Sequence, residues 1–151
     1  MTASPRHSVS VAAAVVRTDG RILAIRRRDN GNWEPPGGIL DLDETIEEGV
    51  TREVSEETGL LVEIDRLTGI YKNMTHGIIA LVFRCHVVNG TPRPTAEASE
   101  AAWLTPEDVR ERMNPAFAIR LLDALDDHAH GPTVRTHDGK DLLTNVETRS
   151  S

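Results

Sequence analysis

Acidic residues at helical spacing are the first feature of this sequence that predicts chemistry. Glu53, Glu56 and Glu57 stand at i, i+3 and i+4 in a segment whose apolar residues recur with helical periodicity. On a helical wheel Glu53 and Glu57 fall on the apolar arc beside Val50, and Glu56 lies to one side. Carboxylates drawn toward a core repel one another unless protons or cations compensate them. Their oxygens suit hard divalent cations such as Mg²⁺ or Mn²⁺, so the pattern predicts a metal site.

Arg52 is placed where it could support such a metal site. It can pair with Glu48 or Glu56 one helical turn away, and it could also orient Glu53 from behind the metal. An ordinary surface ion pair fits the same spacing. Zinc is not predicted, because no cluster of His or Cys accompanies the carboxylates.

The composition narrows the classes of function. A net charge of -7 argues against polymeric nucleic acid, whose binding depends on Lys and Arg, but bound cations would still admit a small phosphorylated ligand. The length of 151 residues predicts one domain over 1–151, with its core at about 8–127 and a tail at 128–151. The longest apolar run near the start is too short to cross a membrane and has no secretory cleavage pattern, so we expect a cytoplasmic protein with no membrane partner. The single cysteine, Cys85, is expected to be a buried structural thiol.

The acidic helix is the second half of a longer motif with fixed spacing. Its defining positions are, in order, Gly38, Glu44, Arg52, Glu53, Val54, Glu56, Glu57, Gly59 and Leu60. All of them match the Nudix box, so over about residues 8–127 the chain resembles the Nudix (MutT-like) hydrolase family. The resemblance implies the α/β class, as an α/β/α sandwich with a mixed sheet. It also implies a hydrolase that uses Mg²⁺ or Mn²⁺ to cleave a nucleoside diphosphate linked to another group.

The resemblance further implies roles for single residues of the box. Glu53, Glu56 and Glu57 would be the metal ligands, and Glu53 is similar to the residue that deprotonates water in some members. Arg52 and Glu44 would belong to the catalytic machinery as supporting residues, with Glu44 an occasional ligand.

A further acid from a later loop completes the metal site or acts as the base in many members of the family. Glu97 and Glu100 are the candidates here, with Glu97 preferred, and the alternative for either is a solvated loop charge. Pro35 departs from the family pattern, which usually has another apolar residue before Pro-Gly-Gly. This departure concerns the local backbone and not the chemistry.

Basic and glycine residues beside the motif predict where phosphate would bind. Arg27 and Arg28 follow Arg26 at the end of an expected strand, and their forked donors suit phosphate. Gly37 and Gly38 allow the backbone to approach a ligand closely. A basic strand end without a ligand is the ordinary alternative for two of the three arginines.

The aromatic residues do not decide how the base of a nucleotide substrate would be bound. Trp33 either stacks on a base or packs as a half-buried indole, and Tyr71 poses the same choice. From the resemblance, a nucleoside triphosphate, possibly modified and cleaved to the monophosphate and pyrophosphate, is the first expectation, because a proline typical of many ADP-ribose-cleaving relatives is missing. The alternatives are ADP-ribose or another nucleotide sugar, a nucleotide sensor without activity, and a structural cation-binding protein.

The helix that carries the acids has clear local signals. Thr45 followed by Glu48 is a capping box, and Gly59 suits the left-handed position after a helix. These residues predict a helix over 46–58.

Other local signals predict the elements around that helix. Strands over 8–16 and 21–27 are expected to form a hairpin around an Asp-Gly turn, and 61–74 and 78–88 a long antiparallel pair. The remaining predicted elements are a short strand at 101–104, a helical turn at 105–107, a helix at 115–127, and a tail at 133–143 with a turn at Asp138-Gly139. The tail is expected to form either an edge hairpin or a homodimer contact. Together these elements predict a mixed sheet with helices on both faces.

Overall fold

The strands of this chain belong to two sheets, one mixed and one antiparallel. The computed structural model describes residues 4–127 and 130–143. In the five-stranded sheet the order is β4-β1-β6-β5-β8, and both β1 with β6 and β5 with β8 run parallel. The three-stranded sheet, β3-β2-β7, is antiparallel. The strands are β1 Ser8–Val15, β2 Ile22–Arg27, β3 Trp33–Glu34, β4 Gly37–Ile39, β5 Leu61–Asn73, β6 Ile78–Asn89, β7 Ala98–Leu104 and β8 Thr133–His137.

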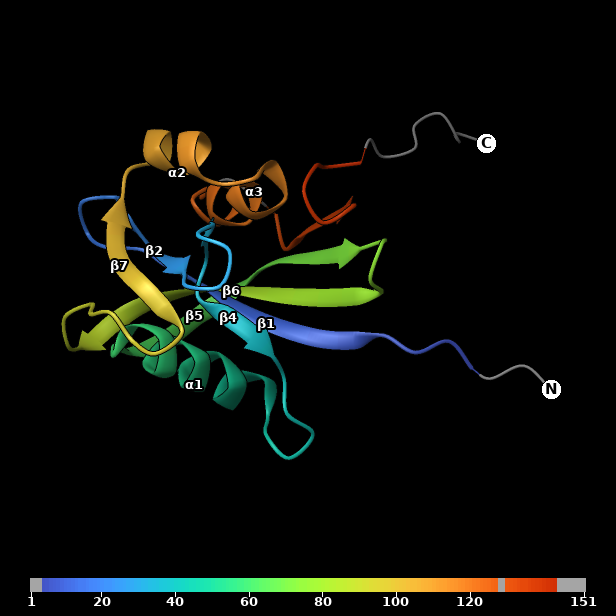
Figure 1. The fold of residues 1–151 in the computed structure, drawn as a ribbon, viewed down its shortest axis with the longest axis horizontal. Helices are drawn as coiled ribbons and strands as arrows, with labels where there is room; N and C mark the ends of the chain where they lie inside the picture. The colour runs from blue at the N-terminus through green and yellow to red at the C-terminus, as the bar shows by residue number, and fades with distance from the viewer. Residues whose placement is uncertain (1–3, 128–129, 144–151) are drawn as a thin grey trace.

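Helices cover the sheets from two sides. The helix α1 (Ile46–Thr58) lies on one side, and α2 (Pro106–Arg112) and α3 (Pro115–Ala124) lie on the other (Figure 1). One buried apolar cluster packs under α1 and a second packs under α2 and α3. This confirms the predicted α/β sandwich with a mixed sheet. Within the part of the chain that the structure describes, no helix is long and apolar enough to span a membrane.

The helix α1 has the bounds and caps that the sequence predicts. The Thr45 side chain accepts a hydrogen bond from the backbone N–H of Glu48, whose carboxylate accepts one from the backbone of Thr45. The helix ends at Gly59, which adopts the left-handed conformation with φ 80°. Val50 and Val54 are fully buried, so the helix face that they share is the one that packs against the sheet.

The predicted hairpin between the first two strands is wrong. The turn forms, but β1 and β2 enter different sheets and are linked only by an isolated bridge between Val16 and Ile22. Successive residues of β1 face opposite cores, with Ala13 in the cluster under α1 and Ala14 in the cluster under α3. Both edges of β1 are paired, with β4 and β6, because its apolar run suits a central strand covered on both faces. No edge is then left for β2.

The remaining predictions differ mainly at element ends. The β5–β6 pair and the start of α2 at Pro106 are as predicted, but β7 begins three residues earlier than expected, at Ala98, and α3 ends at Ala124. The tail forms the parallel edge strand β8 and then turns back, so that Leu142 bridges His137. The predicted edge hairpin is therefore present in a short form. Residues 128–129 and 144–151 of the predicted tail lie outside the described residues.

Candidate active site

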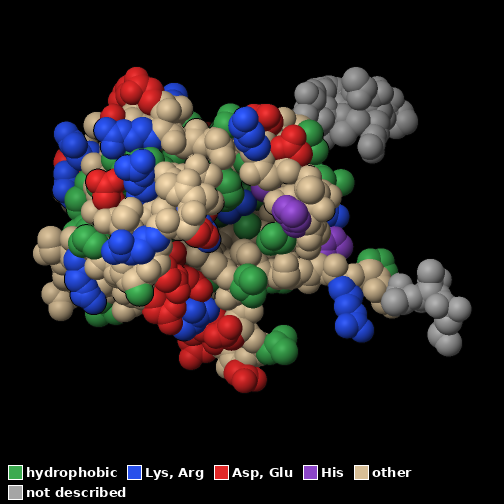
Figure 2. Space-filling model, viewed as in Figure 1, with side chains coloured by type: hydrophobic (Ala, Val, Ile, Leu, Met, Phe, Trp, Pro, Cys, Tyr) green, Lys and Arg blue, Asp and Glu red, His purple; other side chains and the backbone are tan. Residues whose placement is uncertain are grey.

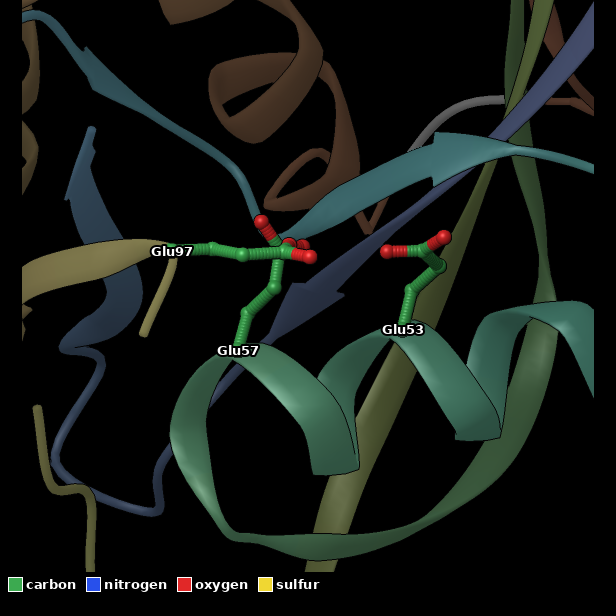
Figure 3. Close-up of side chains that lie close together, drawn as sticks. All are labelled: Glu53, Glu57 and Glu97. Atoms are coloured by element: carbon green, nitrogen blue, oxygen red, sulfur yellow. The ribbon is translucent and has the colours of Figure 1, made fainter. Parts of the chain in front are cut away.

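Three carboxylates converge where the end of α1 meets the start of β7. Glu53 and Glu57 come from α1 and Glu97 from the residues just before β7, and each contributes an oxygen that lies within 4.8 Å of the others. Figure 3 shows the side chains of Glu57 and Glu97 meeting, with Glu53 rising from the same side of the helix. Glu53 and Glu57 are 8% and 4% exposed, whereas Glu97 is exposed. The helical wheel predicted the inward direction of the first two.

Hydrogen bonds on both sides hold Glu97 at the helix. The backbone N–H of Arg28 donates to the carbonyl oxygen of Glu97 at 3.1 Å. The Thr95 hydroxyl donates to the carbonyl oxygen of Glu57 at 3.3 Å. The loop before β7 is thus tied both to β2 and to the end of α1, which explains why an acid far away in the sequence reaches the cluster.

The surroundings of Glu53 and Glu57 disfavour the charged form of both carboxyl groups. Burial raises the pKa of Glu53, and burial raises the pKa of Glu57 to about 8, with the charges of Glu53 and Glu97 adding to the effect. One backbone donor works the other way, because the N–H of Gly37 donates to Glu57 Oε1 at 2.7 Å. A set of carboxylate oxygens in this state fits a hard divalent cation, which would replace the protons that burial otherwise favours.

Two glycines bring the backbone of β4 against these carboxylates. A Cβ on Gly38 would lie 2.6 Å from Glu53 Oε1, and a Cβ on Gly37 would collide with the backbone of β1. Neither glycine has a positive φ. Their small size, rather than their conformational freedom, is what this site requires.

Arg52 and Glu44 form a bidentate ion pair next to the cluster. Arg52 Nε and Nη2 donate to the two oxygens of Glu44 at 2.8 and 2.6 Å, and this pairing lowers the pKa of Glu44 to about 2. Arg52 Nη1 donates to Glu53 Oε1 at 2.9 Å. Arg52 is therefore in place to orient Glu53. Of the two partners that the spacing predicted, Arg52 bonds Glu56 and not Glu48, which caps the helix, and its bidentate partner is Glu44.

Glu56 and Glu100 stand outside the group of three carboxylates. The Glu56 side chain is 51% exposed and accepts a hydrogen bond from Arg52 at 3.3 Å. Glu100 was predicted in a loop, which is wrong, because β7 extends over it and places it opposite Arg26 at 3.4 Å. Of the two later acids, the structure brings only Glu97 to the cluster.

Two of the three consecutive arginines line a cavity beside the cluster. A cavity of about 230 Å³ is bounded by Arg27, Arg28, Glu57 and Glu97 among others. Arg27 donates to Asp29 at 2.9 and 2.6 Å, and Arg28 Nε donates to the carbonyl oxygen of Thr95 at 2.9 Å. Figure 2 shows basic side chains over β2 and β7 and acidic side chains over α1 on one face of the molecule. The site thus opposes cationic and anionic groups across a small opening.

Comparison with known proteins identifies the family. The family model described as NUDIX domain matches residues 6–125. This chain belongs to the Nudix family. It is 63% identical over 142 residues to a MutT-like protein of Streptomyces ambofaciens, which covers 94% of this chain and 91% of that protein. Together these matches support a Nudix pyrophosphohydrolase.

Other relatives support the fold and leave the substrate open. The crystal structure of a MutT NUDIX hydrolase from Burkholderia pseudomallei superposes with a TM-score of 0.70 at 30% identity, over 79% of this chain and 98% of that one. An ADP-ribose pyrophosphatase of Methanocaldococcus jannaschii is 33% identical over 102 residues, which are 63% of this chain and 60% of that protein. Relatives within the family therefore have names that refer to different substrates.

Tyr71 and Trp33, each predicted either to stack on a base or to pack in the protein, differ in their burial in this Nudix chain. Tyr71 is fully buried and its hydroxyl donates to Asp123 at 2.7 Å, so the idea that it stacks on a base is wrong. Trp33 is half-buried, packs against the core under α3, and has the Arg112 guanidinium 5.7 Å from its ring centre. Cys85 is buried as predicted, and burial raises the pKa of its thiol to about 12.

A second cavity was missed by the sequence reasoning. It measures about 250 Å³, borders Gly37, and is lined by Glu34, Phe117, Arg120 and His137 among others. These residues come from β3, α3 and β8, which no local pattern brings together. One signal was available, since Arg120 lies three residues after Phe117 on the apolar face of the last helix, where a charge is out of place.

Proposed function

We propose that this Nudix chain hydrolyses a phosphoanhydride bond of a nucleoside triphosphate, releasing the monophosphate and pyrophosphate, with Mg²⁺ or Mn²⁺ as its cofactor. The observation that carries the proposal is the convergence of Glu53, Glu57 and Glu97 within 4.8 Å beside an arginine-lined cavity. A diphosphate needs positive charge on both sides of the bond that breaks, and this site offers arginines on one side and cation ligands on the other.

The buried carboxylates of α1 are the groups that would hold the cation. Glu53 and Glu57 point to one side of the helix, and the family box adds Glu56, whose carboxylate would have to leave Arg52 to join them. When bound, a divalent cation supplies charge that neutralises phosphate oxygens and makes water more acidic. Arg52 keeps Glu53 in place, and Glu44 in turn fixes the plane of the guanidinium.

The exposed member of the cluster is the proposed proton acceptor. Glu97 reaches the same point as the two buried carboxylates, yet it is open to solvent and lines the cavity with Arg28. A water that enters from solvent would meet Glu97 first, and the carboxylate would take its proton as the water attacks phosphorus. Glu53 is less suited to this step, because Arg52 already donates to one of its oxygens.

The arginines of β2 and the following turn would bind the phosphates. Arg28 makes one hydrogen bond through Nε, and in the described part of the chain its terminal nitrogens make none. Arg27 is held by Asp29 and lines both cavities, so it stands between them. The backbones of Gly37 and Gly38 line the second of these cavities and would let a phosphate approach closely.

The test is release of phosphate and pyrophosphate from GTP, ATP, CTP, UTP and ADP-ribose, with Mg²⁺, with Mn²⁺ and with excess chelator. Glu53→Gln should remove turnover and cation binding, whereas Glu97→Gln should lower turnover and keep cation binding. Glu47→Gln, an exposed change on the same helix, is the matched control and should behave as the wild type. Turnover confined to ADP-ribose would replace the substrate proposed, and cation-dependent nucleotide binding without any turnover would point to a sensor.

A further inference from the structure

The cavity behind Gly37 contains a buried guanidinium whose Nε has no hydrogen-bond acceptor. Arg120 is 8% exposed, and its Nε is buried without a hydrogen-bond partner. Among the described residues no carboxylate lies within ion-pair distance of it. Its guanidinium lies 5.4 Å from the ring centre of Tyr71 and 4.9 Å from that of Phe117, which fix its position between two aromatic side chains.

One imidazole, that of His137, lies within hydrogen-bond distance of this guanidinium. His137 Nε2 lies 3.3 Å from Arg120 Nη2, while His137 Nδ1 faces the backbone N–H of Gly139 at 3.0 Å. The guanidinium and the backbone N–H can both only donate, whereas a neutral imidazole has a single acceptor nitrogen. Burial together with the positive charge of Arg120 lowers the pKa of His137, which keeps the ring neutral. Arg120 Nη2 and the Gly139 N–H therefore compete for one acceptor nitrogen of His137, and Nε of Arg120 has no acceptor.

Buried donors without acceptors are costly, and a ligand acceptor would remove that cost. The cavity also contains a carboxylate, because Glu34 lines it and forms an ion pair with Arg27 at 3.7 Å. That negative charge disfavours a phosphate group in this cavity. A neutral planar group that offers acceptors to Arg120 and N–H donors to Glu34 satisfies both sides.

We propose that this cavity receives the base of the substrate nucleotide, and that Arg120 and Glu34 select guanine over adenine. Guanine presents O6 and N7 as adjacent acceptors, the pattern that a guanidinium reads best, and its N1–H and amino group are donors for a carboxylate. Adenine carries an amino group in place of O6, so a donor would face a donor. The inference rests on the proposed function, since Arg27 lines both cavities and Gly37, which lines this one, donates to Glu57 of the other, so that a base here would be joined to phosphates there.

The test compares kcat/KM for GTP, ITP and ATP within each protein preparation. GTP should exceed ATP by roughly 10- to 100-fold in the wild type. Arg120→Gln should remove or reverse this preference, because an amide pairs with adenine. Glu34→Gln should reduce the advantage of GTP over ITP, which lacks only the amino group. Arg110→Gln, the same change at an exposed position of α2, should leave all ratios unchanged.

Partial unfolding of a variant does not change these ratios of kcat/KM, because each pair of substrates is measured with the same fraction of folded protein. Equal rates with GTP and ATP in the wild type, or a preference that survives Arg120→Gln, would overturn the inference while leaving the hydrolase intact. If no nucleotide is hydrolysed, the proposed function fails, and calorimetric binding of GTP and ATP to the same proteins decides the base preference by the same ratios.

Discussion

Replacing Gly38 by alanine tests whether the position of the Glu53 carboxylate sets the activity. The new Cβ would lie 2.6 Å from Glu53 Oε1 and 2.8 Å from its carboxyl carbon, whereas ordinary van der Waals contact begins at 3.4 Å. The carboxylate therefore has to move by about 0.8 Å. A displacement of that size in a positioned group can cost about 100-fold in rate, so we expect kcat/KM to fall by about that factor.

The assay for Gly38→Ala combines three measurements on one sample. They are nucleotide turnover, Mn²⁺ affinity by electron paramagnetic resonance, and the free energy of unfolding in urea. Overpacking should cost about 1 to 3 kcal/mol, which leaves a folded protein to measure. Leu42→Ala, in the loop that follows the same strand and at a fully exposed position, should change none of the three by much. Wild-type turnover and Mn²⁺ affinity in Gly38→Ala would refute the argument.

Three further changes probe the structure around the site. Glu44→Gln should lower the Tm at pH 7, and the difference from the wild type should shrink as the pH falls. The pKa of Glu44 is about 2 in the folded protein against an ordinary value of 4.5, because Arg52 donates to its carboxylate. The stabilisation that the charged carboxylate gives is therefore present above pH 4.5 and is lost as the pH falls toward 2. A Tm difference that stays constant from pH 7 to 3 would contradict this. Asp123→Asn should cost about 2 kcal/mol in urea unfolding, because Asp123 accepts from Tyr71 at 2.7 Å and from Arg135 at 2.8 and 2.9 Å; an unchanged midpoint would argue against that network. Burial raises the pKa of Cys85 to about 12, so a disulfide reagent at pH 8 should label it only after denaturation; rapid labelling of the native protein would show that the thiol is accessible.

The parts of this molecule that the sequence predicts well depend on local physics. The capping box at Thr45, the left-handed Gly59 and the inward direction of Glu53 and Glu57 all follow from spacing within one helix. Helix periodicity also implies that Glu56 lies apart from the other two, and in the structure it is exposed and bonded to Arg52. Such features need no knowledge of what the helix packs against.

The parts that the sequence predicts poorly depend on which strands become neighbours. An Asp-Gly turn suggested a hairpin, but β1 is a central strand whose edges pair with β4 and β6. The extent of β7 follows from pairing with β2, which also separates Glu100 from Glu97. Arg120 and His137 meet only because β8 lies beside β5 on the sheet next to α3. No pattern within either segment encodes that contact.

The central claim is that the α1 carboxylates bind a divalent cation on which hydrolysis depends. Its most direct test is a Mn²⁺ titration followed by electron paramagnetic resonance, with GTP turnover measured in the same samples, for the wild type, Glu57→Gln and Glu47→Gln. We predict that bound Mn²⁺ and turnover rise together in the wild type and in Glu47→Gln, and that both are lost in Glu57→Gln. Turnover that persists in excess chelator, or wild-type Mn²⁺ binding by Glu57→Gln, would contradict the claim.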